Sequence, residues 1–155
     1  MSGDMEALYQ SLILDHARSP EGRGDTAGWS PRSRQISPTC GDDITLALRL
    51  EDGRIAAVRW EGHGCAVSQA SASLLSGIVA GRSGEEALGL AAELREVMRS
   101  RGRLQLDEER FGDAVALSGV SRYVGRVKCA MLAWVALEDA LAEPAGTGSR
   151  LHDES

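Results

Sequence analysis

Aromatic residues are scarce in this sequence of 155 residues: three Trp, two Tyr and one Phe make up 4% of the chain. Basic residues are also in the minority, because 17 Lys and Arg stand against 23 Asp and Glu, giving a formal net charge of −6. Proteins that bind nucleic acids need basic patches for the phosphates and often aromatic rings for the bases. The composition therefore disfavours nucleic acid as a partner.

The sequence also lacks a long apolar run. Its longest stretch without a charged residue, 62–81, is interrupted by Gln69 and four serines, whereas a bilayer span needs about 20 mostly apolar residues. The first six residues lack the basic and apolar regions of a signal peptide. We therefore expect no membrane segment and a cytoplasmic location.

Cysteine is limited to Cys40, Cys65 and Cys129. An odd number of distant cysteines without a secretory signal does not form a disulfide framework, so we expect free thiols. The remaining composition, 43% hydrophobic and 26% charged, is that of a globular protein. We expect a single domain over residues 1–145, followed by a flexible tail over 146–155 that is rich in Gly and Ser.

The first half of the chain combines a helical pattern with a hairpin pattern. Apolar residues recur at helical spacing from Met5 to His16, which predicts an amphipathic helix that begins near Asp4 and ends before Pro20. Residues 32–37 are compatible with a weak strand within a loop-rich segment. Alternating residues over 44–50 and 56–61 flank Asp52-Gly53, a tight-turn signal, and predict two antiparallel strands.

The second half is predicted to be helical. Helical spacing follows Cys65 as far as Gly81, and Ser83 with Glu86 forms a capping-box pattern for a helix that stops at Gly102. Residues 103–120 have no clear periodicity. A last helix is expected over 126–142, apolar on every side from Cys129 to Leu137. The pattern predicts an α+β domain: a small antiparallel sheet of about three strands with helices packed on one side.

The hairpin brings Cys40, just before it, close to Cys65, just after it. A helix start at Cys65 and the cations Arg126 and Lys128 before Cys129 favour thiolates. Three thiolates with Asp42 form a plausible tetrahedral zinc set, and sulfur ligands also suit iron. The spacing contains no C-x-x-C pair, so from spacing alone the cysteines are equally explained as small buried core residues.

Three sequence motifs favour a metal site over core packing as the role of the cysteines. The segment Ser37-Pro38-Thr39-Cys40-Gly41-Asp42 resembles the N-P-x-C-G-D motif of the IscU/NifU-like iron–sulfur assembly proteins. The segment 62–73 resembles their G-x-G-C-x-x-S-x-A-S-x-S motif, and Arg126-Val127-Lys128-Cys129 lies where their third cysteine falls. The Tyr9…Asp15-His16 pattern is similar to their first helix. The likeness covers residues 5–142 and implies an IscU/NifU-like fold with a metal site at one end.

Within that superfamily, the chain more closely resembles the SufU-type zinc-dependent sulfurtransferases than the scaffold members. Scaffold members carry histidine before the third cysteine, where this sequence has Lys128, and R-x-K-C and the segment 103–120 match the SufU branch. The resemblance implies zinc ligands Cys40, Asp42, Cys65 and Cys129. It also implies that a histidine of a SufS-type cysteine desulfurase displaces one ligand, so that Cys40 is released to accept persulfide sulfur for downstream SUF assembly proteins.

Two alternatives remain at this stage: a scaffold that assembles an Fe–S cluster on the same four side chains, and a zinc protein whose metal only stabilises the fold. Arg126 and Lys128 are expected to stabilise the released thiolate or steer the partner, or else to be solvated rim charges. The histidines His16 and His63 are interpreted as packing or surface residues rather than ligands. Ser71 and Ser73 are interpreted as helix-packing hydroxyls, and Trp60 and Trp134 as core aromatics.

Overall fold

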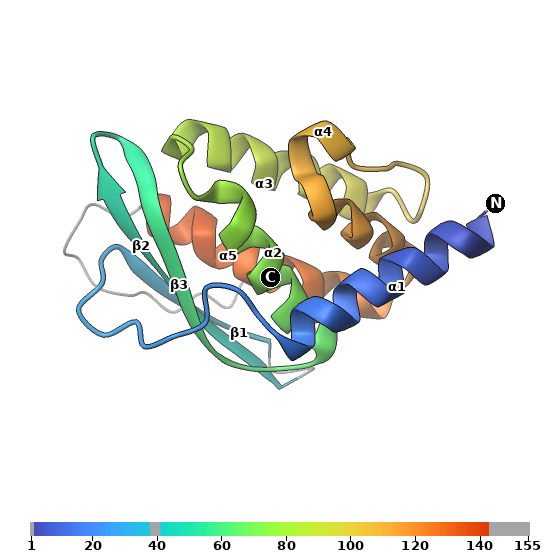
Figure 1. The fold of residues 1–155 in the computed structure, drawn as a ribbon, viewed down its shortest axis with the longest axis horizontal. Helices are drawn as coiled ribbons and strands as arrows, with labels where there is room; N and C mark the ends of the chain where they lie inside the picture. Colours follow the sequence, from blue (N-terminus) through green and yellow to red (C-terminus); the bar gives the residue numbers. More distant parts are fainter. Residues whose placement is uncertain (1, 38–40, 143–155) are drawn as a thin grey trace.

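A three-stranded antiparallel sheet organises the fold, and a computed structural model describes residues 2–37 and 41–142 of it (Figure 1). Strand β2 (Asp42–Glu51) lies in the centre, between β1 (Arg32–Ser37) and β3 (Arg54–His63). The hairpin turn is confirmed: Asp52 and Gly53 both have positive φ, 54° and 79°, as a two-residue hairpin loop requires. The weak strand predicted over 32–37 is β1 itself.

Helices cover one face of this sheet. Helix α5 (Val124–Ala142) packs against β1 and β2, and α2 (Ala66–Val79) packs against β3. Outside them lie α1 (Ser2–Arg18) and α3 (Gly84–Arg99), with the short α4 (Glu108–Phe111) and the 3₁₀ helix η1 (Gly112–Arg122) (Figure 1). The predicted α+β class, with helices on one side of the sheet, is confirmed.

The core lies between the sheet and the helices. Trp60 and Trp134 are fully buried, as predicted, and Phe111 packs beside Trp134 with ring centroids 6.4 Å apart. The hydroxyl of Ser71 donates to the carbonyl of Ala130 at 2.6 Å and accepts from Trp134 Nε1 at 3.0 Å. Its predicted packing role is confirmed, because it joins α2 to α5 inside the core.

Several predicted details are wrong. Leu8, in the first predicted helix, and Leu88, in the helix predicted after Ser83, are apolar residues that are nevertheless 53% and 40% exposed. The last helix begins at Val124, two residues before the predicted start. Residues 103–120 contain α4 and most of η1, and a 3₁₀ helix lacks the 3.6-residue spacing that the sequence analysis sought. The predicted tail, 146–155, lies outside the described residues.

None of the helices in the described part of the chain is long and apolar enough to span a membrane.

Candidate metal centre

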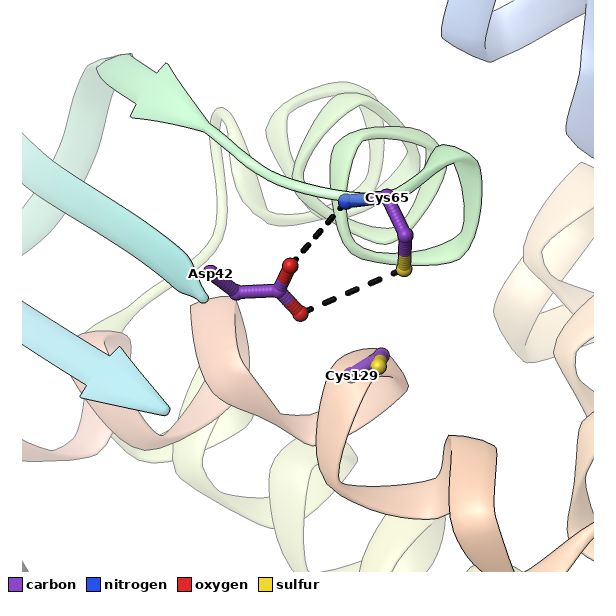
Figure 2. A group of neighbouring side chains, drawn as sticks. All are labelled: Asp42, Cys65 and Cys129. Carbon is purple, nitrogen blue, oxygen red and sulfur yellow. Dashed lines mark hydrogen bonds between the residues drawn. The ribbon is translucent and has the colours of Figure 1, made fainter. Parts of the chain in front are cut away.

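Three of the four predicted ligands converge at one end of the sheet. A carboxylate oxygen of Asp42 and the Sγ atoms of Cys65 and Cys129 all lie within 4.8 Å of one another. Figure 2 shows the three side chains pointing toward a common space, each from a different element. Asp42 begins β2, Cys65 is the residue before α2, and Cys129 lies in α5. The fourth predicted ligand, Cys40, lies outside the described residues.

The antiparallel pairing explains why Asp42 meets Cys65. Asp43 pairs with His63 at the end of the hairpin, so the start of β2 lies beside the residues that lead into α2. The backbone N–H of Cys65 donates to Asp42 Oδ1 at 3.0 Å, and Cys65 Sγ lies 4.0 Å from Oδ2 (Figure 2). This bond fixes the carboxylate and also satisfies an N–H group at a helix N-terminus.

Gly64 makes room for this arrangement. A Cβ atom at Gly64 would lie 2.6 Å from Asp42 Oδ1 and would collide with Ser68 Oγ. Ser68 donates its hydroxyl hydrogen to the carbonyl of Cys65 at 3.0 Å, with Oγ 3.8 Å from Cys65 Sγ. Ser68 was not among the predicted site residues. Its position three residues after Cys65, one helical turn away, is the sequence feature that indicates its place in the site.

The burial and the donor set fit a metal ion. Asp42 and Cys129 are 0% and 1% exposed, and Cys65 is half-buried. No Lys, Arg or His among the described residues forms an ion pair with Asp42, although a buried carboxylate needs a compensating charge. Neighbouring ligand atoms of a tetrahedral zinc ion lie about 3.3–3.8 Å apart. A contraction of about 1 Å would bring the three groups to that geometry.

Cys129 lies within its helix and not at the start. It is the sixth residue of α5, whose first residue is Val124. Lys128 and Arg126, which were expected to supply positive charge, are both exposed. Arg126 lines a groove of about 630 Å³ that also exposes Cys65, and Lys128 follows it on the first turns of α5.

This groove leads from the surface to the metal centre. Its walls come from α1, η1 and the start of α2, and its apolar residues include Tyr9, Ile13, Val67, Val120 and Tyr123. Sequence reasoning did not predict the groove because its walls are far apart in the chain. It leaves one side of the centre open, as a partner protein would require.

The adjacent charged residues are directed away from the centre. Arg34 donates two hydrogen bonds to Asp43, at 3.0 and 2.7 Å, and this bonding lowers the pKa of the Asp43 carboxyl and raises the pKa of Arg34. His63 is exposed at the end of β3, and His16 Nδ1 lies 2.7 Å from Ser73 Oγ on α2. Neither histidine belongs to the group of three converging ligands.

The fold and the site define an α+β domain whose sheet end carries a carboxylate and two thiols in reach of one ion. The sequence profile of the NifU-like N terminal domain matches residues 8–130, and the chain belongs to this family.

The similar proteins include both a sulfurtransferase and a cluster assembly scaffold. The chain is 34% identical over 145 residues to the zinc-dependent sulfurtransferase SufU of Bacillus subtilis (strain 168), covering 94% of this chain and 97% of that protein. It is 39% identical over 136 residues to the iron–sulfur cluster assembly scaffold protein IscU of Thermotoga maritima, covering 86% and 92%.

A solved structure agrees. A putative iron–sulfur cluster assembly scaffold protein for the SUF system from Fervidobacterium islandicum AW-1 is 30% identical, with a TM-score of 0.74, and the match covers 84% of this chain and 93% of that one. The predicted resemblance is thus confirmed. The family joins iron–sulfur assembly scaffolds and sulfurtransferases.

Proposed function

We propose that this protein is a zinc-dependent sulfurtransferase that accepts persulfide sulfur at Cys40 from a SufS-type cysteine desulfurase. The observation that carries the proposal is the convergence of Asp42, Cys65 and Cys129 within 4.8 Å, with Cys40 two residues before Asp42 in the sequence. Similarity to the protein named SufU over nearly the whole chain supports it. So does Lys128, where the resemblance to scaffolds would require histidine.

In this proposal Cys40, Asp42, Cys65 and Cys129 hold the zinc ion. When bound, zinc keeps its thiol ligands deprotonated and takes no part in electron transfer. The protein fixes two of the ligands in advance: the Cys65 N–H orients the Asp42 carboxylate, and burial in α5 holds Cys129. The proposal assigns the exchangeable thiolate to Cys40.

The transfer itself is a thiolate exchange. The Cys40 thiolate attacks the terminal sulfur of the donor persulfide, so that a bond forms between Cys40 Sγ and that sulfur. The bond between the two donor sulfurs breaks, and the donor cysteine leaves as a thiolate. Cys40 becomes the persulfide and no external electrons are needed. In this proposal Arg126, which lines the groove, and Lys128, exposed two residues later, offer positive charge to the partner.

Metal content and desulfurase stimulation together test the proposal. The protein should contain about one zinc per chain, the capacity of a single four-ligand site, and should stimulate sulfide release from cysteine by a SufS-type desulfurase. Cys40→Ala should abolish this stimulation. Ser76→Ala, which removes a hydroxyl bonded within α2 to Ala72, is the matched control and should stimulate normally. Stimulation by Cys40→Ala would rule out Cys40 as the acceptor.

The scaffold function is the second candidate, favoured by the 39% identity to the Thermotoga protein named as a scaffold. A scaffold would hold a nascent iron–sulfur cluster, its product, on the same side chains. It predicts an iron-containing, coloured protein after reconstitution with iron and sulfide, and no stimulation of the desulfurase. Zinc content with stimulation would exclude it.

A further inference from the structure

The sheet carries a second surface with its own chemistry, on the face opposite the helices. Arg32 of β1 and Arg59 of β3 both pair with Ala47 of β2, so the three lie in one row across the sheet. Arg49 is two residues along β2 from Ala47, on the same face. The connection between α1 and β1 runs beside these strands (Figure 1), and its Trp29 ring contacts Arg49 and Arg59. We call Arg32, Arg49, Arg59 and Trp29 the arginine face.

The guanidinium groups of this face are held in position by contacts other than ion pairs. The Cζ atoms of Arg49 and Arg59 lie 4.4 and 4.5 Å from the centroid of the Trp29 ring. Arg59 and Arg32 each donate one hydrogen bond to a backbone carbonyl of the connection, those of Asp25 and Thr26. Stacking on a ring orders the side chain but leaves most guanidinium N–H groups unused.

The three arginines of the face form no ion pair with a described carboxylate. Among the acidic residues nearby, Asp43 pairs with Arg34. Glu61 is oriented by the N–H and hydroxyl of Thr26, and Asp25 by the N–H of Ala27. Three guanidinium groups without an ion-pair partner among the described residues therefore share one face of a protein whose net charge is −6.

We propose that the arginine face binds an acidic segment of a partner protein. Ordered guanidinium groups that form no ion pair of their own can bind carboxylates bidentately. The surface is a sheet face, and three cations suit a short run of Glu or Asp better than a long nucleic acid, which the overall negative charge would repel. Arg49 is seven residues from Asp42, about 24 Å along the strand. A partner can therefore bind there while the metal centre remains accessible.

The test uses the full chain and a fluorescent ten-residue peptide with four consecutive glutamates, measured by anisotropy at low salt. The same peptide with four glutamines is the negative probe. The double variant Arg49→Gln, Arg59→Gln should weaken binding of the glutamate peptide roughly tenfold or more, as expected for charge-assisted hydrogen bonds. Arg99→Gln with Arg103→Gln, exposed residues at the end of α3 and in the turn after it, removes equal charge elsewhere and should change affinity less than about twofold.

Two further measurements separate a loss of binding from a loss of folding and locate the bound peptide. The single variant Arg49→Gln is informative even if the double variant folds poorly, because Arg49 is exposed and donates no hydrogen bond to a described residue. The indole N–H resonance of Trp29 should shift on peptide binding, while those of the buried Trp60 and Trp134 should not.

Three peptide results would contradict the proposal: no binding of the glutamate peptide, equal binding of the glutamine peptide, or an equal loss of affinity in both double variants. Tighter binding of a ten-nucleotide thymidine strand than of the glutamate peptide would also contradict it. Sedimentation equilibrium adds a further contradiction if it shows a dimer that the face variant dissociates, because a second copy would then occupy the surface.

Discussion

At the scale of single residues, the metal centre depends on atoms that are missing as much as on those present. Asp42 can accept the Cys65 N–H because Gly64, between the hairpin and α2, has no Cβ. Gly62 is equally constrained, since its φ is 134° and a Cβ there would collide with the carbonyl of Asp43. These glycines therefore let the β3–α2 connection approach the start of β2.

Gly64→Ala should weaken zinc binding by about 10–100-fold, the range seen when supports of metal ligands are removed. The added methyl group must displace the Asp42 carboxylate or Ser68. Affinity is measured by competition with a chromophoric chelator. Gly89→Ala is the control: Gly89 lies exposed in α3 with nothing near its Cβ position, so zinc affinity should be unchanged. Equal affinity in both variants would contradict the role of Gly64.

A second residue-scale prediction concerns Ser71. Ser71→Ala should lower the free energy of unfolding by about 1–3 kcal/mol, because Trp134 Nε1–H would be left buried without an acceptor. Urea unfolding of the zinc-saturated protein measures the change. Ser76→Ala should cost less, since its hydroxyl donates to Ala72 O within its own helix. A larger loss in Ser76→Ala would show that the α2–α5 bond is unimportant.

At the scale of helices and strands, the sequence predicted the features that depend only on neighbouring residues, such as turns and helix caps. The Asp52-Gly53 turn needs only positive φ, and the capping box at Ser83 is present as predicted: its Oγ accepts from the Glu86 N–H, and Glu86 accepts from the Ser83 N–H. The 3₁₀ helix η1, in contrast, depends on residues that are distant in the sequence. Its buried residues, such as Ala114 and Leu117, are placed by contacts with α1, α3 and α5. Nothing in adjacent sequence encodes those contacts.

The capping box allows a prediction for α3. Ser83→Ala should cost about 1 kcal/mol of unfolding free energy, because the Glu86 N–H loses its acceptor at the helix start. Ser83→Asn keeps a capping oxygen and should be nearly neutral. Thermal unfolding compares the two. If Asn were as damaging as Ala, the loss would come from packing of Ser83 and not from capping.

At the scale of the whole molecule, the centre joins three elements that the sequence separates: the starts of β2 and α2, and the second turn of α5. The motifs predicted which residues belong together, but their distances depend on how α5 packs across β1 and β2. The core that carries this packing includes Trp60, Trp134 and Leu75, and it is continuous without the ligands. The fold therefore has its own stability, and a bound metal adds to it.

Removal of zinc by a chelator should accordingly destabilise the protein without unfolding it. Binding to the native state alone adds about 2.7 kcal/mol when free zinc is 100-fold above its Kd, and that increment should vanish on chelation. Hydrogen exchange should accelerate at Gly64–Gln69 and the first turns of α5 but not at the β2–β3 turn, which lies at the far end of the hairpin from the site. Cys65→Ser, which removes a ligand thiol, should show little stabilisation by added zinc. Global unfolding of the chelated protein would instead favour a metal that only holds the fold, as in zinc fingers.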